Sequence, residues 1–162
     1  MSGPFKKSDE GFMRLAMDKA LLGTENGQTP FGACIVRKGV VVAVEHNRVW
    51  QTTDITAHAE VQAIRSACRK LKTVSLKDCV IYSTCEPCPM CFSACHWAGL
   101  RTVYYGASIQ DAKLAGFNEL FISAKKMKSA GKSSVHVCGG LLKKENAALL
   151  SQWGRSKGKK TY

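Results

Sequence analysis

Two short segments of this chain carry residues of the types and spacing that hydrolytic metal sites use. These are His58–Glu60 and Pro87–Cys91. One imidazole and two thiolates make three ligands for Zn²⁺, and a tetrahedral zinc with three protein ligands keeps its fourth position for water. A structural zinc would need a fourth side chain. The pattern therefore predicts zinc-assisted hydrolysis, with His58, Cys88 and Cys91 as the metal ligands.

Glu60 lies two residues after His58, close enough to reach a water on the metal without being a ligand itself. Zinc lowers the pKa of such a water to about 7. A carboxylate beside that water can take its proton and pass it to the substrate, and general acid–base transfer contributes about 10²–10⁴ in rate. We therefore expect Glu60 to be the catalytic residue.

An iron–sulfur cluster is the alternative for four clustered cysteines, whose spacing matches that of bacterial ferredoxins: Cys85, Cys88, Cys91 and Cys95. However, His96 follows where ferredoxins have proline. The run also passes from a predicted strand end into a predicted helix, so the four sulfurs would point apart. We interpret Cys85 and Cys95 as buried neighbours of a zinc site. The other four cysteines lie in apolar segments and are typical of core residues.

The composition is typical of a single globular domain, with 162 residues of which 45% are hydrophobic. No apolar run approaches the roughly 18 residues that a transmembrane helix needs. The first residues lack the apolar core of a signal peptide. We therefore expect a cytoplasmic protein whose cysteines stay reduced or bind metal.

The net charge of +12 is unevenly distributed, because residues 125–162 hold ten Lys or Arg and a single acid, Glu145. A basic terminal segment can bind nucleic acid. Here the basic residues are not interleaved with aromatic ones, as they are in single-strand binding platforms. A solvated surface is therefore the other interpretation of this segment.

Helices and strands are expected to alternate after an initial helix and hairpin. The helices are predicted over 9–22, 57–71, 88–99, 109–114, 119–127 and 141–153, and the strands over 31–36, 40–45, 79–83, 101–105 and 135–138. Residues 47–56 are polar and predict a loop. This order indicates a mixed sheet with helices on both faces. It also places both ligand sets at helix N-termini, where free N–H groups favour thiolates and oxyanions.

His-x-Glu followed by Pro-Cys-x-x-Cys is the signature of zinc-dependent nucleobase deaminases. The chain resembles the cytidine deaminase superfamily in residues 30–33, 56–61, 85–91 and 115–117. The resemblance implies an α/β fold, a three-layer α/β/α sandwich around a five-stranded mixed sheet, in one domain over residues 1–162. It also implies one zinc ion per subunit. In this family water attacks the amidine carbon of the base and ammonia leaves. The resemblance implies that Glu60 carries out the proton transfers.

Within the superfamily the chain is most similar to the small bacterial guanine deaminases. Residues 115–119 resemble their Ala-Gly-Phe-Asp-Asp segment, whose second acid binds the guanine edge, which gives this role to Glu119. The final Lys-Lys-Thr-Tyr resembles their Lys-Lys-Glu-Tyr end, which crosses to a partner subunit. The resemblance thus implies a homodimer that exchanges a basic segment of about 140–162, with Tyr162 closing the neighbouring site.

Further positions are expected near the substrate from the same resemblance. Asn47 lies eleven residues before His58, where relatives carry an asparagine that hydrogen-bonds the base. Phe31 would stack on the base and Ala59 would contact it, while Glu145 and Trp97 are further candidates near the site. The structural alternatives are a turn-forming role for Asn47 and a core position for Phe31.

The expected reaction is deamination of guanine to xanthine and ammonia. The chief alternative is the tRNA wobble adenosine deaminase, which shares the zinc core and has a basic C-terminal helix. RNA is an expected partner only under this alternative. The longer Gly-Ala-x-x-Gly-Ser segment of that enzyme has no counterpart after Gly106. Cytosine is a third possible substrate, and guanosine is another because the tail residues that would admit or exclude a ribose match poorly. Asn118 in place of an Asp, and the longer Glu119, leave the exact base open. A non-enzymatic nucleic-acid-binding relative is disfavoured, because it would have no use for Glu60.

Overall fold

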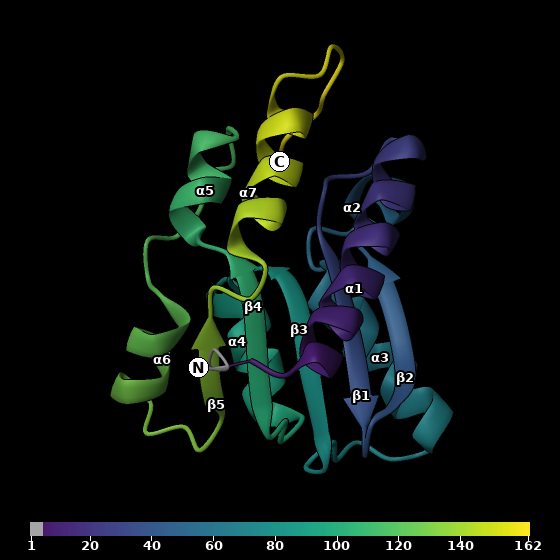
Figure 1. Cartoon of the computed structure of the whole chain (residues 1–162), viewed down its shortest axis with the longest axis vertical. Coiled ribbons are helices and arrows are strands. Elements are labelled where there is room, and N and C mark those ends of the chain that lie inside the picture. Colours follow the sequence, from purple (N-terminus) through teal and green to yellow (C-terminus); the bar gives the residue numbers. More distant parts are fainter. Residues whose placement is uncertain (1–4) are drawn as a thin grey trace.

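A mixed five-stranded sheet lies between helices that cover both of its faces (Figure 1). The computed structural model describes residues 5–162. In chain order the elements are α1 (Lys7–Glu25), β1 (Gly32–Arg37), β2 (Val40–His46), α2 (Val49–Thr52), α3 (Ala59–Leu71), β3 (Cys79–Cys85), α4 (Pro89–Trp97), β4 (Thr102–Ala107), α5 (Ile109–Leu114), α6 (Ala124–Ala130), β5 (His136–Gly139) and α7 (Lys143–Gly154). The predicted α/β/α sandwich with a five-stranded mixed sheet is confirmed.

The strand order is β2-β1-β3-β4-β5. β1 pairs antiparallel with β2 and with β3, whereas β3, β4 and β5 are parallel. The β1–β2 hairpin turns through Lys38 and Gly39, which both have positive φ, as two-residue hairpin turns that match the strand twist require. The last pair between β3 and β4 joins Cys85 to Ala107. The segments that follow these two strands therefore begin side by side.

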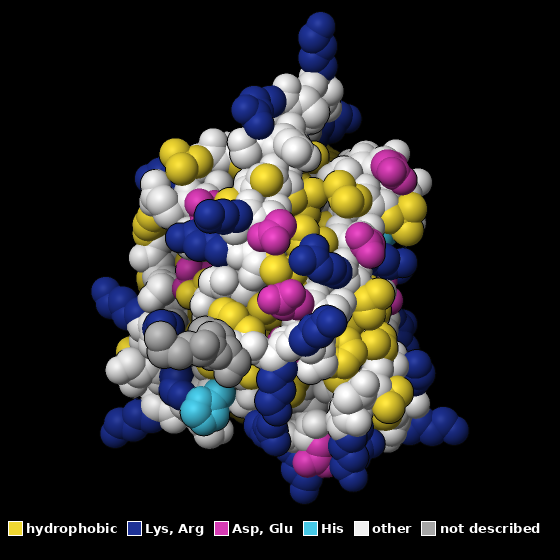
Figure 2. Space-filling model, viewed as in Figure 1, with side chains coloured by type: hydrophobic (Ala, Val, Ile, Leu, Met, Phe, Trp, Pro, Cys, Tyr) yellow, Lys and Arg dark blue, Asp and Glu magenta, His cyan; other side chains and the backbone are white. Residues whose placement is uncertain are grey.

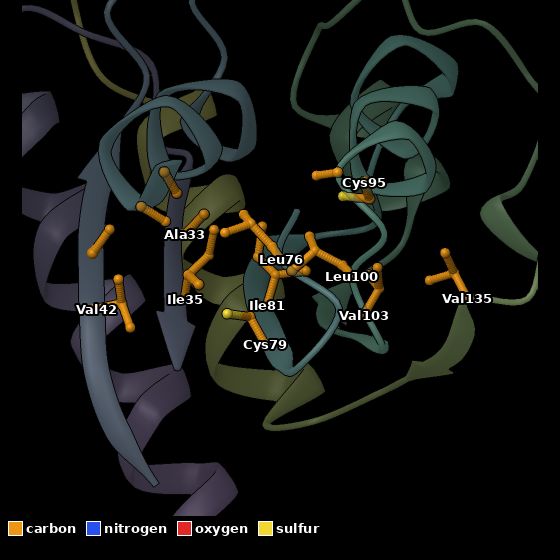
Figure 3. Close-up of a cluster of buried hydrophobic side chains, with 14 of the residues drawn as sticks. Ala33, Ile35, Val42, Leu76, Cys79, Ile81, Cys95, Leu100, Val103 and Val135 are labelled. Carbon is orange, nitrogen blue, oxygen red and sulfur yellow. The ribbon is translucent and has the colours of Figure 1, made fainter. Parts of the chain in front are cut away.

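Each face of the sheet is buried under its own helices, so the strands are apolar on both sides. In β1, Cys34 and Val36 pack with α1, while Ala33 and Ile35 pack with α3 on the other face. Figure 3 shows the hydrophobic cluster on the α3 face, where the side chains of Ile35 and Ile81 lie between the sheet and the helices. Burying one such side chain contributes about 1.5–3 kcal/mol. This packing fixes α3, and α4 beside it, on a common face of the sheet.

Two predicted boundaries are wrong. The helix predicted over 119–127 begins only at Ala124, because the Ser123 side chain accepts a hydrogen bond from Lys126 N at 3.1 Å and caps the helix there. Glu119 consequently lies in a loop. Inside the predicted loop 47–56, residues Val49–Thr52 form a one-turn helix that ends where Thr53 adopts a left-handed backbone conformation (φ 51°).

The basic residues in the second half of the chain belong to separate elements. α6 and the C-terminal residues, which both carry lysines, lie in different parts of the molecule in Figure 1. On the face shown in Figure 2, Lys and Arg are mixed with hydrophobic and acidic side chains. On this face the solvated-surface interpretation is favoured. None of the helices within residues 5–162 has the length and apolar character that a membrane span requires.

Candidate active site

His58 stands at the end of a loop that its own hydrogen bonds hold in place. It is the N-cap residue of α3, with an extended backbone (φ −65°, ψ 156°). Just before it, Asp54 Oδ1 accepts hydrogen bonds from the N–H and the hydroxyl of Thr56, at 2.8 and 2.6 Å. Arg48 N donates to Ala57 O at 2.9 Å. These contacts fix the backbone from which the imidazole extends.

The two thiols come from the first turn of α4, directly after β3. Cys88 is the N-cap residue, with an extended backbone (φ −61°, ψ 168°). Pro89 occupies the first helical position, where its missing N–H would have had no partner in the helix. Cys91 follows three residues after Cys88, a spacing that puts both side chains on one face of the turn. The prediction that both ligand sets lie at helix N-termini is confirmed.

The three predicted ligands meet at one point. His58 Nδ1 lies 3.8 Å from Cys88 Sγ and 3.5 Å from Cys91 Sγ. A tetrahedral zinc with its usual bond lengths separates a nitrogen from a sulfur ligand by about 3.5 Å. All three ligand atoms lie within 4.8 Å of one another, and in residues 5–162 no other set of three His, Cys, Asp or Glu is so arranged. The donor types and their spacing therefore fit Zn²⁺.

The geometry does not support the iron–sulfur alternative. Cys85 and Cys95 are buried but do not belong to the cluster of ligand atoms. The Cys85 thiol instead lies 3.5 Å from Ser108 O, to which it donates. Burial raises the pKa of both thiols, which keeps them protonated. They pack beside the site, as predicted.

The electrostatics of the cluster favour one thiolate even without a metal ion. A hydrogen bond from the Cys91 thiol, together with one from His58, lowers the pKa of Cys88 to about 4 against the opposing effect of burial. The same hydrogen bond to Cys88, and burial, raise the pKa of Cys91 well above its usual value. Burial lowers the pKa of His58, but Cys88 and Glu60 outweigh it and raise the pKa overall. A bound dication would favour the thiolate form of both cysteines.

Glu60 is buried beside this cluster, with only 6% of its surface exposed. Its position in the first turn of α3 directs the carboxylate into the same space as His58 and Cys88. Ser83 of β3 donates a hydrogen bond from its hydroxyl to Glu60 Oε1 at 3.1 Å. Burial raises the pKa of Glu60, which brings its protonated and ionised forms closer in energy. A carboxyl group in this state can both accept and donate a proton.

Two cavities adjoin the cluster and share His58, Cys88, Glu119 and Tyr162. The inner one has a volume of about 20 Å³, enough for one water molecule, and Glu60 forms part of its wall. The outer one has a volume of about 280 Å³. Its walls are mainly apolar: Ile55, His58, Cys88, Pro89, Met90, Phe117, Asn118, Glu119, Leu120 and Tyr162.

Asn47 is fully buried and fixed by two hydrogen bonds. Its Oδ1 accepts from Val49 N at 3.0 Å, and its Nδ2 donates to the hydroxyl of Tyr162 at 2.7 Å. The first contact is the turn-forming role, since it holds the start of α2. The second contact places the amide at the site. Asn47 itself lines neither cavity, and its link to the site is this contact with Tyr162.

Phe31 and Ala59 differ in how they relate to the cavities. Phe31 lines the inner cavity and packs against Phe117, with ring centroids 4.8 Å apart. The Ala59 side chain is fully buried in the core under α3 and lines neither cavity. Glu145 lies 4.0 Å from Arg14 across α1 and α7, and Trp97 is 84% exposed at the end of α4. Neither of these two candidates lines the site.

Glu119 is brought to the site by the loop between α5 and α6. Its side chain is half-buried and lines both cavities. Burial and the nearby Cys88 thiolate raise the pKa of Glu119 to about 7. The preceding Phe117 is buried and stacks on Trp153 of α7, with ring centroids 5.1 Å apart and an angle of 18° between the rings. This stacking anchors the loop that carries Glu119.

Tyr162 closes the site from the opposite end of the sequence. Its ring centroid lies 5.4 Å from that of His58 and 5.9 Å from that of Phe117. The chain reaches this position by turning back from α7, and Trp50 Nε1 donates to Lys160 O at 3.1 Å on the way. In this chain Tyr162 thus lies in the site of its own subunit.

Sequence reasoning missed several residues of the site. Ser83, the partner of Glu60, had only one signal, its polar side chain within an apolar strand. Ile55 and Leu120 line the outer cavity and had no motif to reveal them, while Met90, which also lines it, lies within the cysteine motif. Exposed apolar side chains such as Ile55 and Leu120 are too common on protein surfaces to indicate a binding site by themselves.

Similarity to known proteins shows the family to which the chain belongs. The family model for the cytidine and deoxycytidylate deaminase zinc-binding region matches residues 6–107. Over 154 residues the chain is 40% identical to the guanine deaminase of Bacillus subtilis (strain 168), covering 94% of this chain and 98% of that one.

It is also 36% identical over 146 residues to the tRNA-specific adenosine deaminase of Agrobacterium fabrum, covering 90% of this chain and 93% of the relative. Its structure is similar to that of guanine deaminase from Nitrosomonas europaea, with a TM-score of 0.84, 27% identity, and coverage of 96% of this chain and 87% of that one. The zinc-ligand geometry and these similarities agree. The chain belongs to the cytidine and deoxycytidylate deaminase family of zinc-dependent hydrolytic deaminases.

Proposed function

We propose that this enzyme hydrolyses guanine to xanthine and ammonia. The observation that carries the proposal is the outer cavity, where Glu119 and Tyr162 meet the metal ligands His58 and Cys88. Its volume of about 280 Å³ suits a free base, since pockets for drug-sized molecules have about 300–1,000 Å³. Its apolar walls and one carboxylate match a flat ring with a polar edge.

Guanine recognition would use four residues in and around the two cavities. The Glu119 carboxylate is an acceptor and suits the N1–H of guanine, next to the carbon that reacts. Asn47 would act through Tyr162, whose hydroxyl accepts its hydrogen bond. Tyr162 lines the outer cavity, where its ring would stack on the base, and Phe31 would contact the base from the inner cavity. An adenine edge offers no N1–H to Glu119, and this difference favours guanine.

Catalysis would depend on Glu60. Zinc bound by His58, Cys88 and Cys91 would supply Lewis acidity that acidifies a water molecule. Glu60 lines the inner cavity, which has room for one water, and would take a proton from it. As the water oxygen bonds to C2 of guanine, Glu60 would pass the proton it has taken to N3 of the ring. It would then take the second proton from the new C2 hydroxyl and give it to the 2-amino group, so that the C2 carbonyl forms. The carbon–nitrogen bond then breaks, and ammonia leaves.

The position of Tyr162 supports a free base, and not a base within RNA, as the substrate. An enzyme acting on tRNA must admit a flipped nucleotide together with its ribose and its neighbours. Here the C-terminal segment passes over the site, with Lys160 bonded to Trp50 and Tyr162 bonded to Asn47. A site closed in this way favours a small substrate. The similarity to a tRNA-specific adenosine deaminase keeps wobble adenosine as the second candidate.

We further propose that the enzyme is a cytoplasmic homodimer in which the C-terminal segments are exchanged. The segment already reaches a site in its own chain, and the same contacts with Asn47 would form in a partner. A mixture of two defective chains tests the exchange: Glu60→Gln, and a chain ending at Arg155. Recovery of guanine deamination in the mixed dimer supports exchange, and a mixed dimer without activity contradicts it.

A substrate comparison tests the proposed reaction. Ammonia release is measured with guanine, guanosine, cytosine and a stem-loop RNA with adenosine at the wobble position. The proposal predicts turnover of guanine at least about tenfold more efficient than that of any other substrate, the effect of one well-placed hydrogen bond to a charged group. Turnover of the stem-loop alone would overturn the proposal in favour of RNA editing. The Glu119→Gln variant should lose efficiency with guanine by a similar factor.

A further inference from the structure

Glu86 is a buried carboxylate that the deamination chemistry does not use. It lies in the turn between β3 and α4, two residues before Cys88, and only 8% of its surface is exposed. Its two oxygens accept hydrogen bonds from two different backbone N–H groups. Oε1 accepts from Ala124 at 2.9 Å, and Oε2 accepts from Ile109 at 3.3 Å.

These two N–H groups mark the ends of the segment that carries Glu119. Ile109 is the first residue of α5, and Ala124 is the first residue of α6. The loop between the two helices holds Phe117 and Glu119, and both residues line the outer cavity. The Glu86 side chain thus binds both ends of the segment 109–124, which comprises α5 and the loop that carries Glu119. The backbone N–H of Glu86 donates to Ala107 O at 2.8 Å, which ties the same turn to the end of β4.

Glu86 lies in buried surroundings, where its hydrogen bonds compensate the cost of burying its carboxylate. A buried carboxylate is costly unless hydrogen bonds satisfy it, and backbone N–H groups are the partners it has here. Burial and the Glu86 charge raise the pKa of the neighbouring Tyr105 to about 12, so this side chain stays neutral. Glu86 also contributes to the wall of the inner cavity, together with Glu60 and Glu119.

We propose that Glu86 is a positioning residue for substrate recognition. It sets the distance between the loop of Glu119 and the turn of Cys88, and so determines where the base lies relative to the metal ligands. This inference rests on the proposed function, in which Glu119 binds guanine. Glu86 acts through Glu119 and does not touch the substrate.

The test is a double-mutant cycle with Glu86→Gln and Glu119→Gln, read as KM and kcat for guanine. Gln presents an NH₂ group to one of the two N–H donors, so it keeps the size of the side chain but breaks one contact. We expect KM to rise about tenfold for Glu86→Gln, with a smaller change in kcat and unchanged zinc content. The double variant should raise KM no further than Glu119→Gln alone.

Tyr82→Phe is the matched control, because it removes a buried hydrogen bond, to Asp9 Oδ1 at 2.7 Å, far from the loop. It should lower stability and leave KM unchanged. Ala124→Pro is a second variant in case Glu86→Gln does not fold. This substitution removes the Ala124 N–H that donates to Glu86 Oε1. Ala124 is the first residue of α6, a position where proline is favoured, and the extended backbone of Ser123 (φ −64°, ψ 150°) is compatible with a following proline.

The outcomes separate the two proposals. If Glu119→Gln raises KM while Glu86→Gln has no effect, or the two effects multiply, the positioning role is wrong and the role of Glu119 stands. If Glu119→Gln leaves KM unchanged, the recognition of guanine by Glu119 is wrong and the inference fails with it. A KM increase in Tyr82→Phe equal to that in Glu86→Gln would show a general loss of stability instead.

Discussion

Replacing Tyr162 by phenylalanine removes one oxygen atom and tests whether the C-terminal segment closes the site. The hydroxyl accepts a hydrogen bond from Asn47 Nδ2 at 2.7 Å. Asn47 is fully buried, so the substitution leaves an N–H without its partner and out of reach of water. Such a loss costs about 1–3 kcal/mol. The phenyl ring keeps its contacts with His58 and Phe117, so the change isolates this one hydrogen bond.

If the closed segment holds the base in the outer cavity, this cost appears in KM. An energy of 1–3 kcal/mol corresponds to a rise of about 5- to 150-fold in KM for guanine. kcat should change less, because Glu60 and the metal ligands are untouched. The assay measures initial rates of ammonia release over a range of guanine concentrations. Tyr104→Phe is the control, since Tyr104 lies near the start of α1, away from the site.

The sign of the change is informative. An unchanged KM in Tyr162→Phe would refute a role of the segment in closing over the base. A lower KM would mean that the tyrosine competes with the base for the Asn47 amide. Either result would remove the structural reason for preferring a free base over an RNA substrate.

Three further predictions concern the metal and the stability of the fold. Chelation of zinc should abolish ammonia release, with recovery on addition of Zn²⁺ but not Mg²⁺, because thiolate ligands select zinc; activity that survives complete zinc loss would contradict the assigned ligands. Gly106→Ala should lower the free energy of unfolding by about 1–3 kcal/mol in urea, because its Cβ would overlap the buried Asn146 side chain. The double variant with Asn146→Ala should lose less free energy of unfolding than the two single variants added together. Tyr82→Phe should lower the free energy of unfolding by about 1.5–3 kcal/mol, since it removes the hydroxyl that donates to the buried Asp9 carboxylate; unchanged stability would show that this bond contributes nothing net.

Local patterns were enough to predict much of the fold and the centre of the site. Ser108 and Asp111 form a capping box, and α5 covers the predicted residues. The continuous apolar run of β1 predicted a strand, and both of its faces are buried. The ligand residues were predictable because each lies within a few positions of a helix start, where spacing in the sequence fixes spacing in the structure.

Contacts between distant segments were not predictable in this way. Asn47 and Tyr162 are 115 residues apart, and nothing in the sequence alone pairs them within one chain. The helix predicted over 119–127 failed because the Ser123 cap and the anchoring of Phe117 by Trp153 outweigh local helix propensity. Glu86 lies within residues 85–91, which carry the family resemblance, but its role at two helix starts depends on the tertiary fold.

The central claim is that Glu60 transfers protons in the hydrolysis of guanine beside a zinc ion held by three ligands. The most direct measurement is the rate of xanthine formation from guanine by wild type and Glu60→Gln, each with its zinc content determined. The account predicts one zinc per chain in both proteins, and a rate at least about 10²-fold lower in the variant, the usual contribution of a general acid–base. Equal rates at equal zinc content, or no xanthine from the wild type, would contradict it.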